Sequence, residues 1–228
     1  MDIKTKTMKI TFISDTHNKH KLLTDNNLLP GGDVIIHSGD ISGRGYEDEI
    51  IDFLDWFQDL NYTHKIFIAG NHDFWFEKAF DIEQKYKDKG VVYLFDHFVN
   101  IDGLKVYGSP WQPAFFNWAF NLHTSKDLKY YWDKIPNNLD VLITHGPPKY
   151  ILDVLPIGVN VGCEELTKRV EVVKPKIHCF GHIHSGYGEK YVDGVQYFNA
   201  AVLGENYKLA NNPINIEYNI ESKEIIFN

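Results

Sequence analysis

The sequence MKITFISDTH, residues 8–17, places polar side chains directly after a short apolar segment. Apolar and polar residues alternate over 8–14, which predicts a β-strand. Asp15 and His17 follow where that strand should end. Carboxylate and imidazole groups are common ligands of divalent cations. The stretch therefore predicts a strand with candidate metal ligands at its carboxyl end.

The same arrangement recurs along the chain. Short apolar runs bounded by turn residues lie at 33–37, 65–69, 140–144 and 176–180, as is typical of strands buried on both faces. The polar residues that follow these runs are Asp40 after the second strand, Asn71, His72 and Asp73 after the third, His145 after the fourth, and His182 and His184 after the fifth. Open α/β sheets bind their ligands at the carboxyl ends of strands, so we expect these side chains to meet.

The remaining patterns indicate an α/β fold. Apolar residues at helical spacing predict helices over 46–60, 74–88 and 164–173. Asp102-Gly103 and Asp193-Gly194 each separate two short strand patterns, which predicts two β-hairpins. Strand–helix alternation together with late hairpins implies two packed mixed sheets flanked by helices. We expect residues 1–228 to form one domain, because the sequence contains no linker, repeat or low-complexity tract.

Composition excludes several classes of protein. The 228 residues include 23 Lys and Arg against 31 Asp and Glu, a formal charge of −8 that disfavours an extended nucleic-acid partner. An apolar content of 43% is too high for a disordered chain. No stretch is long and apolar enough for a membrane span, and the polar start does not resemble a signal peptide. Cys163 and Cys179 lack zinc-type spacing, so we expect reduced, structural cysteines in a cytoplasmic protein.

Each polar motif has an ordinary explanation when taken alone. Asp-x-His is common, Gly-Asp is usually a turn, Gly-Asn-His-Asp can begin a helix, and His-x-His can pack on one face of a strand. It is improbable that all of them coincide at strand ends by chance. The candidate ligands are Asp15, His17, Asp40, Asn71, His145, His182 and His184.

This ligand set constrains the metal. It offers nitrogen and oxygen donors without thiolate, which suits divalent Mn, Fe, Zn or Mg and argues against Cu(I) and iron–sulfur centres. Seven protein ligands exceed the need of one catalytic ion with an open position. We therefore expect two divalent cations that share a carboxylate, with Mn as the favoured metal.

The motifs D-x-H, G-D, G-N-H-D, T-H-G and G-H-x-H resemble those of the calcineurin-like metallophosphoesterase superfamily, from Ile10 to about Tyr207. Longer strings are similar to the metallophosphoesterase-domain-containing subgroup, which is related to class III cyclic-nucleotide phosphodiesterases. They are HSGD at 37–40, IAGNHD at 68–73, YGSPWQP at 107–113, LITHGPP at 142–148 and FGHIHSGYG at 180–188. Some vertebrate members of that subgroup carry glycine at the first histidine of G-H-x-H and turn over poorly. This chain keeps His182, so the resemblance implies a complete site.

The resemblance also implies a ligand assignment and a fold. One metal would be held by Asp15, His17, Asp40 and His184, and the second by Asp40, Asn71, His145 and His182. Asp40 would bridge the ions, with a hydroxide between them that attacks phosphorus. The implied fold is a four-layer α/β/β/α sandwich, in agreement with the two-sheet reading of the patterns.

Hydrolysis of a phosphate ester also needs a proton donor for the leaving group. His72 adjoins the candidate ligand Asn71, so we expect it to act as the general acid. Asp73 has two interpretations: it orients the His72 imidazole, or it places a negative charge at a helix N-terminus.

The expected function is a phosphodiesterase for small esters, with cyclic nucleotides as one candidate substrate. A phosphomonoesterase, such as a nucleotide or protein phosphatase, could have the same site, because outer loops decide the substrate. From a different class, a regulatory module could bind metal and nucleotide without catalysis, although the complete ligand set argues against this.

Other features carry open alternatives. The aromatic segment 111–120, WQPAFFNWAF, is either a wall that stacks nucleobases or, as we favour, a loop that covers the core. Arg44 could contact a substrate phosphate or be an ordinary surface arginine. The other histidines are expected to pack or face solvent, with His37 and His178 as candidates to support the metal ligands.

Overall fold

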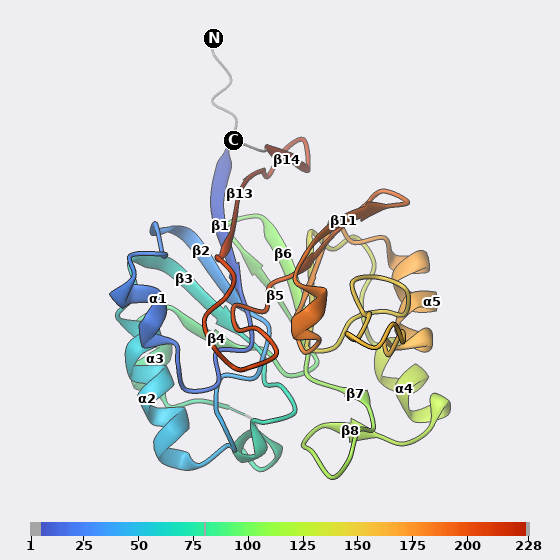
Figure 1. Ribbon diagram of the computed structural model, residues 1–228. Helices are drawn as coiled ribbons and strands as arrows, with labels where there is room; N and C mark the ends of the chain where they lie inside the picture. The colour runs from blue at the N-terminus through green and yellow to red at the C-terminus, as the bar shows by residue number, and fades with distance from the viewer. Residues whose placement is uncertain (1–5, 80, 227–228) are drawn as a thin grey trace.

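The computed structural model describes residues 6–79 and 81–226, and two mixed β-sheets face each other within these ranges (Figure 1). The first sheet has the strand order β14-β13-β1-β2-β3-β4. Strands β1 to β4 run parallel, and β13 pairs antiparallel with β1. The strand bounds are β1 Thr7–Ile13, β2 Gly32–His37, β3 Tyr62–Phe67, β4 Val91–Tyr93, β13 Ile214–Asn219 and β14 Glu224–Ile226. The expected strands over 8–14, 33–37 and 65–69 correspond to β1, β2 and β3.

The second sheet has the strand order β11-β12-β10-β9-β6-β5. Its strands are β5 His97–Ile101, β6 Leu104–Ser109, β9 Val141–Thr144, β10 Ile177–Phe180, β11 Gly188–Val192 and β12 Val195–Asn199. Strands β6, β9, β10 and β12 are parallel, and both predicted hairpins are present as β5–β6 and β11–β12. Asp102-Gly103 and Asp193-Gly194 adopt positive φ at both turn residues, as tight hairpin turns require. A small separate pair joins β7 (Gln112–Pro113) to β8 (Asn121–Leu122).

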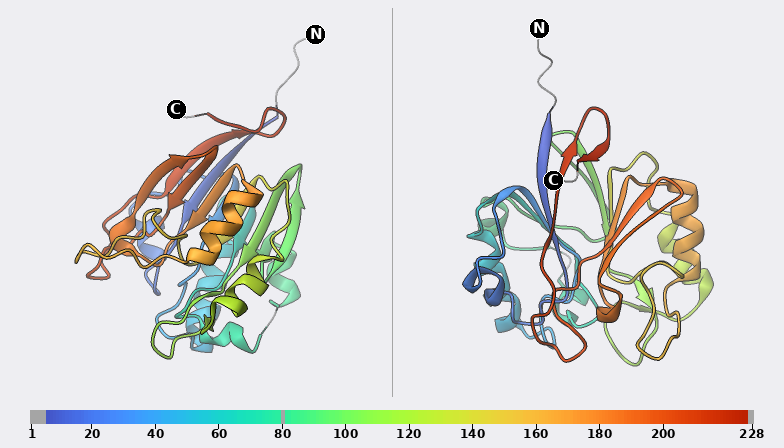
Figure 2. Two further views of the ribbon diagram at one scale, coloured as in Figure 1. Left: turned by 90° about the vertical axis from the view of Figure 1, so that its right-hand side faces the viewer. Right: turned by 45° about the horizontal axis from the view of Figure 1, so that its top comes forward.

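Helices cover the outer face of each sheet, which gives the four layers that were expected. The α-helices are α1 Lys21–Asp25, α2 Glu47–Gln58, α3 Gln84–Lys87, α4 Ser125–Trp132 and α5 Glu164–Val173. In Figure 1, α1 to α3 lie outside the first sheet, and Figure 2 shows α4 and α5 outside the second. Helix α2 packs Phe53 and Phe57 against Ile35 of β2 and Phe67 of β3.

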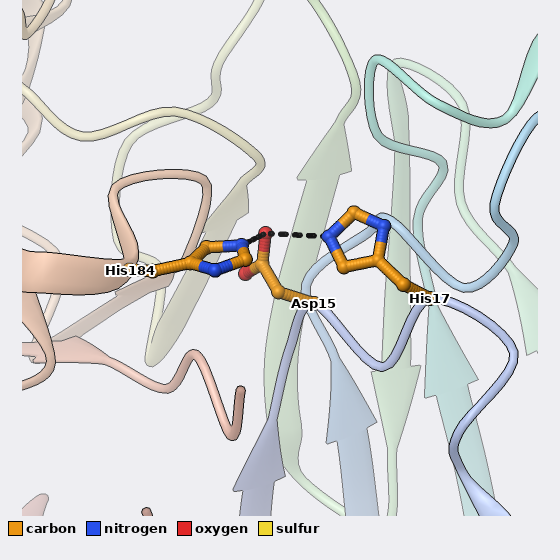
Figure 3. A group of neighbouring side chains, drawn as sticks. All are labelled: Asp15, His17 and His184. Carbon is orange, nitrogen blue, oxygen red and sulfur yellow. Dashed lines mark ion pairs between the residues drawn. The ribbon is translucent and has the colours of Figure 1, made fainter. Parts of the chain in front are cut away.

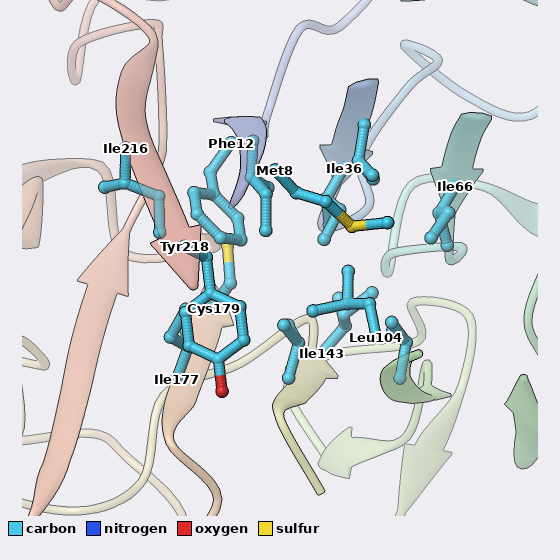
Figure 4. Packing of buried hydrophobic residues seen from close by; sticks show 14 of the residues in the cluster. Met8, Phe12, Ile36, Ile66, Leu104, Ile143, Ile177, Cys179, Ile216 and Tyr218 are labelled. Carbon is cyan, nitrogen blue, oxygen red and sulfur yellow. The ribbon is translucent and has the colours of Figure 1, made fainter. Parts of the chain in front are cut away.

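The space between the sheets is filled with apolar side chains (Figure 4). Phe12 and Ile36 from the first sheet meet Ile143 and Ile177 from the second, and all four are fully or almost fully buried. Burial of each such side chain stabilises the fold by about 1.5–3 kcal/mol. Neighbouring positions on the same strands pack outward against the helices, which explains why these strands read as continuous apolar runs.

The prediction of a helix over 74–88 is wrong. The structure has a 3₁₀-helix, η1 (Phe74–Glu77), and the single turn α3, with residue 80 outside the described ranges. The buried side chains of this segment are Phe76, Ile82 and Tyr86. Separate helical turns thus bury Phe76 and Tyr86 without one continuous helix.

The two sheets come together at the end where the parallel strands finish. Ser14, directly after β1, forms an isolated parallel bridge with Ala201, which follows β12. The backbone N–H of Val202 donates to the carbonyl of Ser14 at 3.0 Å. Loops from both sheets therefore share one edge of the molecule. Among the described residues, no helix is long and apolar enough to cross a membrane.

Candidate metal centre

The loops at this shared edge hold the candidate ligands. Within the described residues, three groups have ligand atoms that all lie within 4.8 Å of one another. The groups are Asp15, His17 and His184; His17, Asp40 and His72; and Asp40, His145 and His182. His17 and Asp40 each belong to two groups, so the three groups form one continuous cluster.

Asp15 lies between two histidines in the first group (Figure 3). Its Oδ1 atom is 3.3 Å from Nε2 of His184 and 3.9 Å from Nε2 of His17. The backbone N–H of His182 donates to both carboxylate oxygens of Asp15, at 3.1 and 2.9 Å. The loop after β10 therefore fixes a carboxylate that belongs to the loop after β1.

Asp40 occupies the centre of the cluster, and its two oxygens face different histidines. Oδ1 is 3.3 Å from Nε2 of His145, whereas Oδ2 is 3.6 Å from Nε2 of His17 and 3.9 Å from Nε2 of His72. The backbone N–H of His72 also donates to Oδ1 at 2.8 Å. This arrangement suits a carboxylate shared by two cations, because each oxygen is directed to a different set of candidate ligands.

Asn71 and His182 complete the arrangement around Asp40. Oδ1 of Asn71 is 2.9 Å from Nε2 of His145, and the rings of His145 and His182 lie 5.0 Å apart. The structure thus brings together all the residues predicted as ligands. Their individual roles as ligands stay a prediction, which the experiments below address.

Backbone carbonyls fix the orientation of several of these imidazoles. The carbonyl acceptors are Ser42 for His17, Gly43 for His72, Ser38 for His145 and Gly204 for His184, at 3.3, 2.7, 2.9 and 3.1 Å from Nδ1. Because a carbonyl oxygen only accepts, each Nδ1 carries the proton, and Nε2 faces the cluster as a potential ligand atom. Nε2 of His17 is buried and has no hydrogen-bond partner among the described residues. The residues therefore fit a divalent cation.

Two ionised carboxylates and two charged histidines share the cluster. Burial disfavours ionisation of Asp15 and Asp40, yet hydrogen bonds and charge from His184 and His145 hold the pKa of both carboxyls well below the usual range. Burial likewise opposes the charged forms of these histidines, but their carboxylate partners raise the pKa of each to about 9. Burial lowers the pKa of His17 to about 4, so it is neutral near pH 7. A bound cation would displace the protons of the two charged histidines.

Two glycines allow the loops to approach this closely. A Cβ atom at Gly181 would lie 1.9 Å from Oδ2 of Asp15, and one at Gly70 would lie 2.3 Å from Oδ1 of Asp40. No real side chain could occupy either position without moving a candidate ligand. The glycines in the predicted motifs therefore serve close packing rather than a turn alone.

The backbone at the cluster is strained. Asp15, His17, Asp40 and His182 all adopt positive φ, between 40° and 64°. Residues other than glycine pay roughly 1–2 kcal/mol for this conformation. Such strain persists where the surrounding structure enforces it, as at ligand-binding sites.

Asp73 has a different position from the one expected. Its carboxylate accepts hydrogen bonds from the N–H groups of Ile41, Ser42 and Gly70 and from the Ser42 hydroxyl, at 2.6–3.2 Å. The ring of His72 is oriented by the Gly43 carbonyl instead. Burial and the charge of Asp40 raise the pKa of Asp73 to about 6. Asp73 therefore joins the loops after β2 and β3, and neither orients His72 nor caps a regular helix.

Other residues support the cluster from behind. Nε2 of His37 contacts Oγ1 of Thr16 at 2.9 Å, and Nε2 of His178 contacts Oγ1 of Thr144 at the same distance. Both histidines thus contact a threonine adjacent to a candidate ligand and not the ligand itself. Sequence reasoning missed Tyr207, whose ring lies 4.9 Å from that of His17 and 5.3 Å from that of His184. No motif in the sequence marks this tyrosine. Both cysteines are buried and unpaired, as expected.

Comparison with known proteins agrees with this geometry. The family model described as calcineurin-like phosphoesterase matches residues 8–186. The human and mouse proteins named metallophosphoesterase domain-containing protein 1 are each 39% identical over 229 residues, which covers 90% of this chain and 69% of theirs. The crystal structure of TT1561 from Thermus thermophilus superposes with a TM-score of 0.62 at 12% identity over 97% of this chain and 98% of that one, which shows a shared fold. This chain belongs to the calcineurin-like phosphoesterase family, whose members are metal-dependent phosphoester hydrolases.

Proposed function

We propose that this protein is a phosphodiesterase that uses two divalent cations and hydrolyses small esters. The main support is the position of Asp40, whose oxygens face His145 on one side and His17 and His72 on the other. Two cations bound by these residues would acidify a water molecule and neutralise the charge of the phosphoryl group. We propose Asp15, His17, Asp40 and His184 as one ligand set and Asp40, Asn71, His145 and His182 as the other.

We propose that His72 protonates the leaving alcohol. Its Nδ1–H donates to the Gly43 carbonyl at 2.7 Å, so the ring is fixed and Nε2 points toward the cluster. A protonated Nε2 can deliver its proton to an alkoxide without any movement of the backbone. General acid catalysis of this kind contributes about 10²–10⁴-fold to a rate, and most to esters with poor leaving groups.

Two cavities next to the cluster favour a diester over a monoester. One, of about 420 Å³, is bordered by His182 and His184. The other, of about 730 Å³, is bordered by Trp118, whose ring stacks on His72 at 4.1 Å. Phe115 lines both. A phosphodiester has two substituents to accommodate, whereas a monoester has one.

The test is turnover of bis-p-nitrophenyl phosphate against p-nitrophenyl phosphate. Protein is stripped with EDTA and reloaded separately with Mn²⁺, Fe²⁺, Zn²⁺ or Mg²⁺, and we expect Mn²⁺ to give the highest rate. Metal content is measured on each sample, with two ions per chain expected for the wild type and fewer for Asp40→Asn. His97→Ala, an exposed histidine on β5, is the matched control.

Each outcome separates one alternative. Preference for the monoester would replace the diesterase assignment with a phosphomonoesterase. A fully loaded protein that turns over neither ester would instead support a regulatory module that binds metal without catalysis. One ion per chain at full activity would refute the two-metal arrangement.

His72→Ala tests the proton donor. We expect unchanged metal content and a kcat lower by about 10²–10⁴-fold for an alkyl diester, with a smaller loss for p-nitrophenyl esters, which leave without a proton. Equal losses for both kinds of leaving group would contradict the acid role. A cytoplasmic location stays a prediction from the sequence; tagged protein followed by microscopy would test it.

A further inference from the structure

The aromatic segment 111–120 divides into two parts in the structure. Its ends pack into the core, where Ala119 and Phe120 are buried and Trp111 lies against them. Its middle is exposed: Phe115 and Phe116 have 53% and 75% of their surface accessible. The interpretation as a core-covering loop therefore holds for the ends alone, and the middle requires another explanation.

The backbone that carries the exposed rings is held by Asn121. The side chain of Asn121 on β8 accepts from the N–H of Phe115 at 3.3 Å and donates to the carbonyl of Phe116 at 2.8 Å. The two phenyl rings contact each other edge to face, with centroids 4.5 Å apart. Phe116 adopts a φ of 47°, which is unfavourable for a bulky residue. The strain and exposure of Phe116 together support a role in ligand binding.

This loop forms one wall of the larger cavity beside His72. The cavity measures about 730 Å³, and its lining includes Arg44, Tyr46, Phe74, Phe115, Phe116 and Trp118. Trp118 connects the cavity to the metal centre, because it stacks on His72 at an interplanar angle of 24° and lies 5.9 Å from Phe74. Five aromatic side chains thus line an open cavity, and one of them, Trp118, stacks on the proposed proton donor.

Arg44 supplies the positive charge of this cavity. Its backbone N–H and that of Tyr46 donate to Oε2 of Glu49, at 2.9 and 3.1 Å, which fixes the loop after Asp40. The guanidinium group forms no ion pair with any described residue. The chain carries a net charge of −8, so an unpaired arginine within an aromatic cavity favours an anionic ligand.

We propose that this cavity binds the alcohol portion of the ester and selects a planar ring that carries its own anionic group. The ring stacks on the aromatic wall, and Arg44 pairs with a phosphate or carboxylate attached to that ring. The proposal rests on the phosphodiesterase function, because the phosphoryl group must sit at the metal centre for the ring to enter here. It assigns a role in substrate selection to Arg44 and Phe116 and makes neither a catalytic residue.

The test uses three phosphonates that the enzyme cannot hydrolyse. Methylphosphonate lacks a ring, benzylphosphonate adds one, and carboxybenzylphosphonate, as its 3- and 4-isomers, adds the anion. Dissociation constants are measured by calorimetry on Mn²⁺-loaded protein. For the wild type we expect about tenfold tighter binding on addition of the ring, which is a typical effect of stacking on aromatic side chains. We expect a further gain of roughly 2- to 5-fold for at least one carboxylate isomer, and this gain should shrink as salt increases.

Two variants separate the contributions. Phe116→Asn removes the ring at a position where Asn tolerates positive φ, so we expect a Tm at or above that of the wild type. We also expect this variant to lose most of the difference in affinity between benzylphosphonate and methylphosphonate. Arg44→Gln should lose the extra affinity that the carboxylate provides, together with its salt dependence, and should keep the extra affinity that the benzyl ring provides. Arg44→Lys should recover part of the affinity for the carboxylate. Tyr191→Ser, at an exposed tyrosine on β11, is the control and should change none of these values.

The outcomes distinguish this inference from the function on which it rests. Equal affinity of the wild type for all the phosphonates, with bis-p-nitrophenyl phosphate still hydrolysed, would overturn the cavity assignment alone. Absence of both hydrolysis and methylphosphonate binding would overturn the proposed function. A uniform loss of affinity for every phosphonate in Phe116→Asn would show a structural role for this loop and would also refute the inference.

Discussion

His178 should contribute to the sensitivity of the protein to mild acid, and His178→Gln should remove that contribution. The ring is fully buried on β10. Thr144 donates its hydroxyl proton to the Gly146 carbonyl at 2.8 Å, so it must accept from Nε2–H of His178. Nδ1 is then bare, and it has no partner among the described residues. Protonation would create a buried charge without an acceptor.

The magnitude follows from the pKa difference between the folded and unfolded chain. Burial lowers the pKa of His178 from 6.5 to about 3. The unfolded chain therefore binds a proton below pH 6.5 that the folded chain binds only near pH 3, so stability falls as the pH decreases through this window. At pH 5 the loss is about 2 kcal/mol, from about 1.36 kcal/mol per pH unit. For a chain of this length that corresponds to a Tm lower by about 4–8 °C.

The assay is urea unfolding of metal-free protein at pH 7 and pH 5. Metal is removed because acid would also release it from its histidine ligands. Gln keeps a donor for Thr144 and does not titrate, so we expect His178→Gln to lose about 2 kcal/mol less than the wild type between the two pH values. His97→Gln, at an exposed histidine, serves as the control. Parallel pH dependence of wild type and His178→Gln would refute this reasoning.

Three further predictions concern the metal centre. Gly181→Ala should weaken Mn²⁺ binding at least tenfold, because its Cβ would lie 1.9 Å from Oδ2 of Asp15. Gly146→Ala is the control and should fold and bind Mn²⁺ normally, because no atom lies closer than 3.8 Å to the added Cβ. Equal Mn²⁺ affinity of the two variants in calorimetry would contradict this prediction. Asp73→Asn should lower the free energy of unfolding by about 2–4 kcal/mol, since an amide NH₂ replaces one acceptor oxygen and leaves buried N–H groups unpaired. An unchanged urea midpoint would argue against that joining role. Mn²⁺ at about 100 times its Kd should stabilise the folded chain by about 2.7 kcal/mol, visible as a higher Tm in thermal scans and absent in Asp40→Asn.

The metal centre was predictable from sequence because its information is local. Each candidate ligand follows an apolar strand within a few residues, and parallel strands bring their carboxyl ends to one edge. The two-sheet architecture was predictable for a similar reason, since Asp102-Gly103 and Asp193-Gly194 specify hairpins on their own.

Sequence failed where structure depends on distant contacts. The aromatic residues of 74–88 suggested a helix. In the structure Phe74 lies beside Trp118 and Phe76 enters the core, and a 3₁₀ turn places both side chains. Strand β13 was not predicted, although the apolar residues Ile214, Ile216 and Tyr218 alternate with polar ones. The neighbouring sequence does not indicate that this segment pairs with β1. Helix α4 was missed as well.

The role of Asp73 could not have been derived from its neighbours in sequence. Its carboxylate accepts from Ile41 and Ser42, more than thirty positions away, and only the fold brings them into contact. The same holds for Arg44 and the segment 111–120, whose meeting in one cavity is set by the fold rather than by local sequence.

The contact between Asp15 and the loop of Gly181 and His182 spans most of the chain length and joins the two halves of the molecule. His145, His182 and His184 come from the second half, so the complete set of candidate ligands forms only after that half has been synthesised and has docked. By thermodynamic reciprocity, ions that bind only the docked form also oppose separation of the halves. If cations bind at this site, chelation should loosen the contact between the two halves first.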